Sequence, residues 1–151
     1  MSKLLYNLHS LCLTQAETNR LDAFHVRCLR RILKIAPSFY SRVPNKDVMQ
    51  VAGAESASHM LLERQLLWMG GLAARPDDHV LRKSIFKSGL DRFELQLPEG
   101  RKKRGRPKLH WASQVYKHAL HAAGNKAMLQ QMWQSTPQVE WKRCVQQYCH
   151  A

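Results

Sequence analysis

The apolar residues of this chain recur with the period of an α-helix over most of its length. Residues that commonly begin or end helices interrupt the repeat at Pro37, Gly53, Pro76, Gly124 and Pro137. Residues 3–13 lack this regularity, and their spacing predicts a short extended segment; the pattern also loosens between residues 86 and 100. The sequence therefore predicts a mainly α fold. It would have a helical bundle-like N-terminal unit over residues 1–88, a basic linker over 89–108 and a short C-terminal helical unit over 109–151.

The first predicted helix begins at Thr14, because Thr14 and Glu17 have the spacing of a capping box, and it ends at Pro37. On a helical wheel its apolar side holds Leu21, Phe24, Cys28, Ile32 and Ile35, widened by Val26, Leu29 and Leu33. The opposite side is basic and free of acids, and it holds Arg20, Arg27, Arg30, Arg31 and Lys34. A solvated face usually mixes both signs, so this stripe favours contact with backbone phosphates over simple solvation.

Further helices are predicted on both sides of the linker. Residues 38–44 are expected to form a loop, and residues 45–52 a short helix. The next helix begins at Ser56 or Ser58, and its dense apolar content between residues 60 and 72 predicts core. The apolar spacing over residues 109–122 predicts another helix. The last helical pair covers 125–134 and 137–148, with proline at the first position of its second member.

Charge is the strongest indication of a partner class. The 151 residues include 24 Lys plus Arg against 11 Asp plus Glu, which gives a formal net charge of +13. Such a field attracts polyanions, so nucleic acid, RNA or DNA, is the leading partner, ahead of an anionic membrane surface and of plain solubility. No apolar stretch approaches the ~20 residues that cross a bilayer. We expect neither a membrane nor a small-molecule substrate as partner.

The densest basic segment lies near the end of the predicted linker. Its cations are Arg101, Lys102, Lys103, Arg104, Arg106 and Lys108. The tripeptide Gly105-Arg106-Pro107 resembles an AT-hook, in which a narrow extended backbone lets arginine enter the minor groove of A·T-rich DNA. A nuclear localisation signal and an inert linker are the alternatives.

No set of residues predicts catalysis, a metal or another cofactor. Cys144, Cys149 and His150 lie close together in sequence, but a zinc site needs four ligands of suitable spacing, and helical packing explains the cysteines. The pair Asp77-Asp78 has the composition of the metal-binding aspartates of polymerases. It follows proline and precedes a short helical pattern, so helix capping is the preferred interpretation.

Several segments together resemble the C-terminal part of LINE-like (non-LTR) retrotransposon reverse transcriptases, from the thumb to the end of the protein. They are Ser2-Lys-Leu-Leu-Tyr6, Leu21-Asp-Ala-Phe24, Arg27-Cys-Leu-Arg-Arg-Ile-Leu33, Arg42-Val43 with Asn45, Ala52-Gly53, Leu62 to Trp68, Pro76-Asp-Asp78, Gly100 to Lys108 with Trp111, and Glu140-Trp-Lys-Arg143. Their order and spacing carry the resemblance, which spans almost the whole chain. The chain departs from the family at Asn7, His9 and Leu11, where a glycine, an acid and a tryptophan are usual.

The resemblance implies a non-catalytic role in target-primed reverse transcription, in which this region holds template RNA or target DNA. Arg27, Arg30, Arg31 and the run 101–108 would be contacts, and the product would be nuclear or part of a cytoplasmic ribonucleoprotein. The palm with its catalytic aspartates is not represented, so no polymerase activity is expected. The chain would be a truncated or decayed reading frame or one part of a longer product. The alternatives are an independent AT-hook-like chromatin protein and a relic without selected function.

Overall fold

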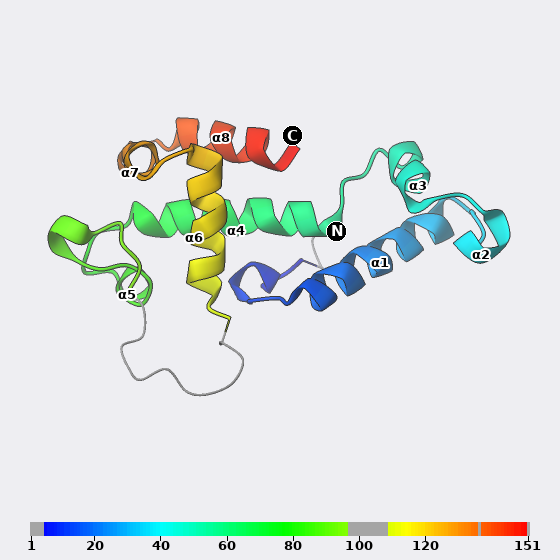
Figure 1. The fold of residues 1–151 in the computed structure, drawn as a ribbon, viewed down its shortest axis with the longest axis horizontal. Coiled ribbons are helices and arrows are strands. Elements are labelled where there is room, and N and C mark those ends of the chain that lie inside the picture. Colours follow the sequence, from blue (N-terminus) through cyan, green and yellow to red (C-terminus); the bar gives the residue numbers. More distant parts are fainter. Residues whose placement is uncertain (1–4, 97–108, 136, 151) are drawn as a thin grey trace.

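A computed structural model describes residues 5–96, 109–135 and 137–150, without the side chain of residue 91. The chain is 67% helix, and the described residues contain no β-strand, which confirms the mainly α prediction. In chain order the elements are η1 (Leu8–Ser10), α1 (Gln15–Ile32), α2 (Ser38–Ser41), α3 (Asn45–Val51), α4 (Ala57–Ala73), α5 (Val80–Lys83), η2 (Gly89–Asp91), α6 (Trp111–Ala123), α7 (Lys126–Gln134) and α8 (Val139–His150) (Figure 1). None of the helices in the described ranges is long and apolar enough to span a membrane.

Helix α4 is the central element of a body formed by α4 to α8 with residues 84–96. Figure 1 shows α8 running beside α4, with α6 crossing it. The buried cluster includes Leu66 and Met69 of α4, Val115 of α6 and Trp141 of α8. The dense apolar sequence of α4 therefore supplies the core, as its pattern predicts, and this core joins residues on both sides of the predicted linker.

The first part of the predicted linker belongs to that core. Phe86 is fully buried and Phe93 is 3% exposed, and both rings pack against Trp133. Phe86 and Leu95 form an isolated antiparallel bridge. The prediction of a linker is therefore wrong for residues 89–96, because the aromatic side chains of this loosely patterned segment pack against partners that lie far away in the sequence. The remainder, residues 97–108, lies outside the described residues.

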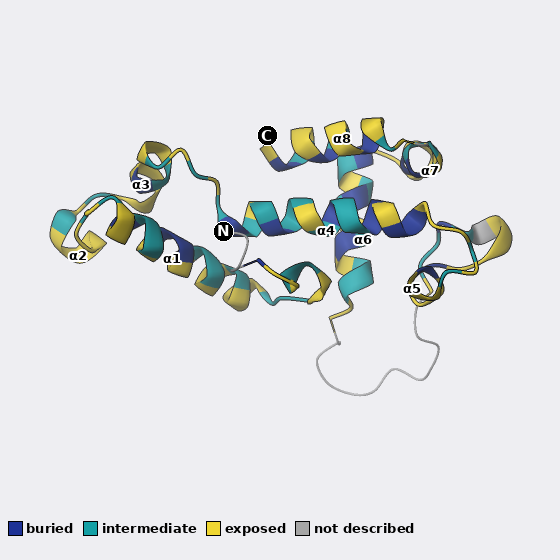
Figure 2. Cartoon of the chain, turned by 180° about the vertical axis from the view of Figure 1, so that it is seen from behind, coloured by how far each residue is buried: buried dark blue, intermediate teal, exposed yellow. Residues whose placement is uncertain are grey.

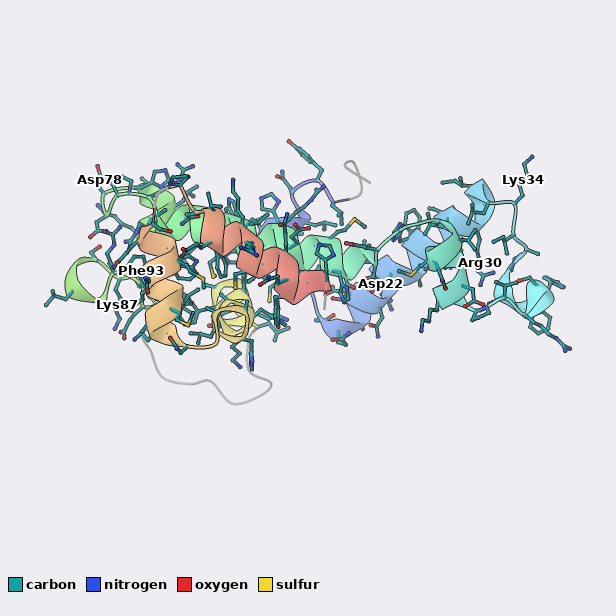
Figure 3. The ribbon with its side chains drawn as sticks, turned by 90° about the horizontal axis from the view of Figure 1, so that it is seen from above. Asp22, Arg30, Lys34, Asp78, Lys87 and Phe93 are labelled. Carbon is teal, nitrogen blue, oxygen red and sulfur yellow. The ribbon has the colours of Figure 1, made fainter. Side chains whose placement is uncertain are left out.

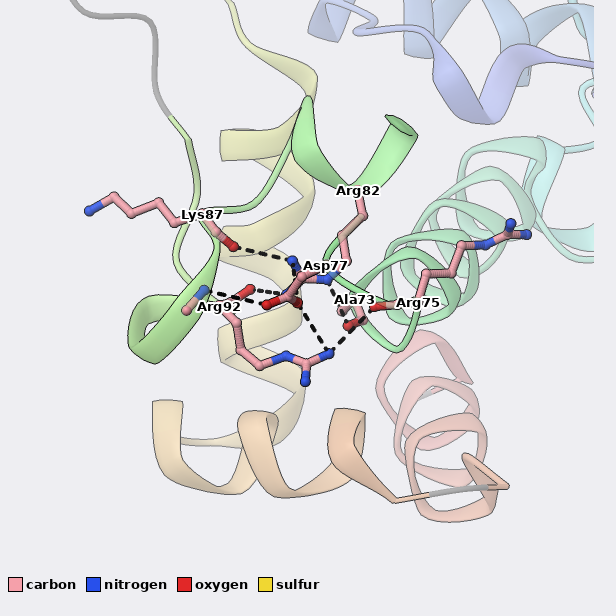
Figure 4. Close-up of polar contacts among 7 residues, drawn as sticks. Ala73, Arg75, Asp77, Arg82, Lys87 and Arg92 are labelled. Atoms are coloured by element: carbon pink, nitrogen blue, oxygen red, sulfur yellow. Dashed lines mark hydrogen bonds and ion pairs between the residues drawn. The ribbon is translucent and has the colours of Figure 1, made fainter. Parts of the chain in front are cut away.

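A buried arginine holds this segment in place (Figure 4). The guanidinium of Arg82 donates to the carbonyl oxygens of Ala73 at 3.4 Å, Lys87 at 3.2 Å and Arg92, and it lies 3.2 Å from Asp77 Oδ1. Asp77 is thus an ion-pair partner rather than a helix cap. The predicted capping by Asp77 or Asp78 is wrong, because His79 occupies the N-cap position of α5 without a side-chain hydrogen bond.

Helices α1, α2 and α3 form an arm that extends away from the body (Figures 1 and 2). The predicted capping box is present, since Thr14 Oγ1 accepts from the Glu17 amide and Glu17 accepts from the Thr14 amide. Asp22 Oδ1 accepts a 2.8 Å hydrogen bond from the Ser58 amide and so ties α1 to the first turn of α4. That turn is capped by Ser56, one of the two predicted residues.

Four local boundaries differ from the prediction. Residues 8–10 form a 3-10 helix rather than an extended segment, and Trp111 Nε1 donates to the His9 carbonyl at 2.7 Å. Helix α1 ends at Ile32, ahead of Pro37, because Lys34 takes the left-handed backbone conformation. The expected loop at 38–44 contains α2. Helix α8 begins at Val139, so Pro137 is not its first residue.

Candidate nucleic-acid interface

The side of α1 that carries the predicted basic residues faces solvent. Arg20, Arg27 and Arg31 are exposed and lie within about 40° of one another around the helix axis. Lys34, just beyond the helix, is also exposed and is labelled at the far end of the arm in Figure 3. These four residues, here called the basic stripe, therefore present positive charge along one side of α1 and just beyond its C-terminal end.

The prediction for the apolar side of α1 is only partly confirmed. Val26 is buried as predicted and Leu21, Cys28, Leu29 and Leu33 are half-buried, but Phe24 and Ile32 are 48% and 74% exposed. His25 and Arg30, which the prediction leaves out, are also buried, so the buried side extends toward them. The reason is that α3 and α4 pack against α1 on this side, a contact that the apolar spacing of α1 alone does not reveal.

Arg30 does not belong to the basic stripe, although the sequence places it there. Its side chain is only 7% exposed. Nη1 donates to the Ala36 carbonyl at 3.0 Å, and Nη2 donates to the Val43 carbonyl at 2.5 Å and to Asn45 Oδ1 at 3.0 Å. A guanidinium with these partners holds the segment between α1 and α3 in shape and is not free to bind phosphate.

An open pocket of about 340 Å³ lies between α1 and the start of α2. Its lining includes Arg27 and Arg31, the buried Arg30, and the segment Ile35, Pro37 and Ser38. None of the described acidic residues lines it. Two of the four stripe residues thus border a concave surface that combines apolar side chains with positive charge.

The sequence window that contains all the lining residues carries charge of one sign. Residues 23–46 contain no Asp or Glu, and their cations are Arg27, Arg30, Arg31, Lys34, Arg42 and Lys46. The nearest acids in sequence, Asp22 before this window and Asp47 after it, have structural roles. Asp22 accepts from the Ser58 amide, and Asp47 lies in the first turn of α3, where a carboxylate stabilises the helix N-terminus. No carboxylate within residues 23–46 therefore offsets the positive potential of these cations.

Two aromatic residues that the sequence analysis does not single out follow Pro37 and Ser38 of the pocket lining directly in sequence. Phe39 and Tyr40 of α2 are 87% and 77% exposed, and their rings meet edge to face with centroids 5.3 Å apart. The signal that could have drawn attention to them is the acid-free window itself, since it encloses both aromatics among the six cations.

The second predicted contact region, comprising Arg101, Lys102, Lys103, Arg104, Arg106 and Lys108, lies outside the described residues. Its role stays a prediction.

The three C-terminal residues considered for zinc have different partners. Cys149 is buried, and burial raises the pKa of its thiol to about 11. Cys144 Sγ donates to the Ala122 carbonyl at 3.1 Å, and His150 Nδ1 lies 2.7 Å from Glu55 Oε1. Each side chain is accounted for by contacts of its own, and no group of three metal-ligating side chains occurs in the described ranges.

Comparison with known proteins yields no match to a family model, to a curated protein or to a solved structure.

Proposed function

We propose that this chain is a non-catalytic nucleic-acid-binding module whose basic stripe contacts the phosphate backbone. The observation that supports this most directly is the exposure of Arg20, Arg27, Arg31 and Lys34 on the arm, the last three within residues 23–46, which hold no acid. Arginine and lysine in such an arrangement neutralise phosphates and release counterions. The run 101–108 would add a second basic contact region.

Within that function we propose the role that the sequence resemblance implies, namely holding template RNA or target DNA as part of a LINE-like reverse transcriptase. The matching segments include the arginine-rich helix and the run 100–108 but none of the catalytic aspartates of a palm. We therefore assign no polymerisation step to these residues. Binding is expected to be spread over both basic regions and to be weakly dependent on sequence.

The second candidate is an independent DNA-binding protein of the AT-hook type, supported by Gly105-Arg106-Pro107. This candidate predicts selective binding to A·T-rich duplex DNA, because the narrow minor groove of such DNA attracts an inserted arginine. Replacing Arg106 would then abolish the selectivity, whereas under the first candidate it would weaken binding to all ligands by a similar factor.

The test is a salt titration of binding by the full chain to an A·T-rich duplex, a mixed-sequence duplex and a hairpin RNA. For Arg27→Ala/Arg31→Ala, the plot of log affinity against log salt should become shallower by about 1.8 for the duplexes, from ~0.9 per phosphate contact. The Arg106→Ala variant separates the two candidates.

The matched control is Lys83→Ala/Lys117→Ala, which removes two exposed charges from the body instead of the arm. It should change the slope much less. Binding by the wild type that is undetectable or insensitive to salt would contradict both candidates. A control that weakens binding as much as the arm variant would contradict the assignment to the basic stripe.

A further inference from the structure

Two of the 4 residues of α2 are exposed aromatics. Phe39 and Tyr40 leave 87% and 77% of their surfaces in solvent. Large aromatic side chains contribute most to stability when they are buried, so exposing two neighbouring rings gives up that stabilisation. A pair of this kind on a charged surface marks a contact site more often than an isolated apolar residue does.

The backbone that carries the pair is held in one conformation. Nη1 and Nη2 of Arg30 bind the carbonyl oxygens of Ala36 and Val43, which flank α2 on either side. Ser41 Oγ donates to the Ala36 carbonyl at 3.0 Å, and the Arg42 amide donates to the Ser38 carbonyl at 3.0 Å. The rings are thus presented by a preorganised turn, which reduces the entropy lost when a ligand stacks on them.

Two non-glycine residues with left-handed backbone bound this turn. Lys34 has a φ of 58° and Arg42 a φ of 53°. Such conformations cost free energy for residues with side chains and persist where surrounding contacts impose them. Both residues are cations, so the turn that presents the aromatics is bounded by positive charge at each end.

The aromatic pair also adjoins the pocket of the basic stripe. Pro37 and Ser38, which immediately precede Phe39, line that pocket together with Arg27 and Arg31. A strand whose phosphates lie along the two arginines would therefore bring its bases toward α2. Exposed rings next to a positively charged groove are the combination with which proteins bind single-stranded nucleic acid.

We infer that α2 is a stacking platform for unpaired bases, so that the arm binds single-stranded RNA or DNA in preference to a duplex. This inference rests on the proposed function and names its ligand. In a duplex the faces of the bases are covered by their neighbours, whereas in a single strand they can stack on Phe39 and Tyr40. The one-sign charge around the rings favours a polyanion over a protein partner, because the centres of protein interfaces are depleted of charge.

The experiment compares binding of the full chain to a fluorescent single strand of about 12 nucleotides, as RNA and as DNA, with binding to the blunt duplex of the same sequence. For Phe39→Ala/Tyr40→Ala, affinity for the single strand should fall by roughly ten-fold to a hundred-fold, from the cost of losing stacked bases. Affinity for the duplex should change less than about two-fold, since phosphate contacts are kept.

Two further variants serve as controls. Phe39→Tyr/Tyr40→Phe keeps both rings and should bind the single strand as the wild type does. Tyr6→Ala removes another exposed tyrosine, 76% exposed and outside α2, and should change nothing. Circular dichroism of each variant checks that the helices persist. A single strand that carries 5-iodouridine should crosslink to Phe39 or Tyr40 on irradiation.

Equal loss of single-strand and duplex affinity in the alanine variant, or no loss of either, would overturn the platform while leaving nucleic-acid binding intact. Unchanged binding together with reduced self-association in sedimentation would overturn it as well, since the rings would then serve a second copy of the chain. Failure of the wild type to bind either the single strand or the duplex at low salt would instead contradict the proposed function itself.

Discussion

The indole of Trp141 lies directly against the backbone of Gly70. A Cβ atom at position 70 would overlap Trp141 Nε1, and this nitrogen donates to the Leu66 carbonyl at 3.2 Å one turn earlier in α4. Only glycine permits so close an approach of α8 to α4. Because Trp141 also meets Trp133 edge to face, this contact joins α4, α7 and α8.

Replacing Gly70 by alanine should therefore destabilise the body. We expect a loss of about 1–3 kcal/mol in the free energy of unfolding, since the added methyl group forces the indole away from α4. Urea denaturation measures it. The neighbouring Gly71 is the control: a Cβ atom there would have open space around it, so Gly71→Ala should stabilise the chain by about 0.5–1 kcal/mol. Equal effects of the two substitutions would contradict the close contact.

Arg82→Met should also destabilise the body, although it removes a buried charge. Methionine fills the space but leaves the carbonyl oxygens of Ala73, Lys87 and Arg92 without their shared donor, which costs about 3 kcal/mol. Thermal unfolding followed by circular dichroism measures it. Lys83→Met, at the adjacent exposed position, should lie within about 0.5 kcal/mol of the wild type. If Arg82→Met were as stable as that control, the carbonyl contacts would not matter.

Arg30 and Arg31 are neighbours that should behave in opposite ways. Arg30→Ala is expected to cost about 2 kcal/mol of stability, because it removes the hydrogen bonds that hold residues 36–45. Arg31→Ala should leave unfolding unchanged and weaken binding to nucleic acid, because this side chain is exposed. Parallel denaturation and binding measurements on both variants decide this. Loss of binding without loss of stability in Arg30→Ala would show that Arg30 contacts the ligand.

Stability should decline as the pH falls from about 7 toward 5. Burial lowers the pKa of His118 and of His25 below that of an exposed imidazole, so the unfolded chain takes up protons before the folded chain does. The stabilisation is complete above the unfolded pKa and is lost as the pH falls through that of the folded state. Urea denaturation at several pH values measures the decline, which should be smaller in His118→Gln. His59→Gln, at an exposed position, should keep it.

The candidate interface shows which exposed cations a charge pattern in the sequence can predict and which it cannot. The sequence places Arg20, Arg27, Arg31 and Lys34 on one side of a helix, and in the structure all four are exposed. It places Arg30 among them, although Arg30 is buried. Helical spacing describes only the angle around the axis, whereas burial of a guanidinium requires acceptors in the right place. Those acceptors belong to residues 36–45, whose conformation no local pattern indicates.

The sequence by itself determined the features that depend on neighbours along the chain. The capping box at Thr14, a serine cap at Ser56 or Ser58, the ends of helices near Gly53 and Gly124 and the apolar α4 follow from local hydrogen bonding, backbone freedom and helical period. Tertiary packing decided which side of α1 is buried, that residues 89–96 join the core, and that two arginines serve the fold. Each of these depends on the free energy of contacts between distant segments, where burial and hydrogen bonding override local preference.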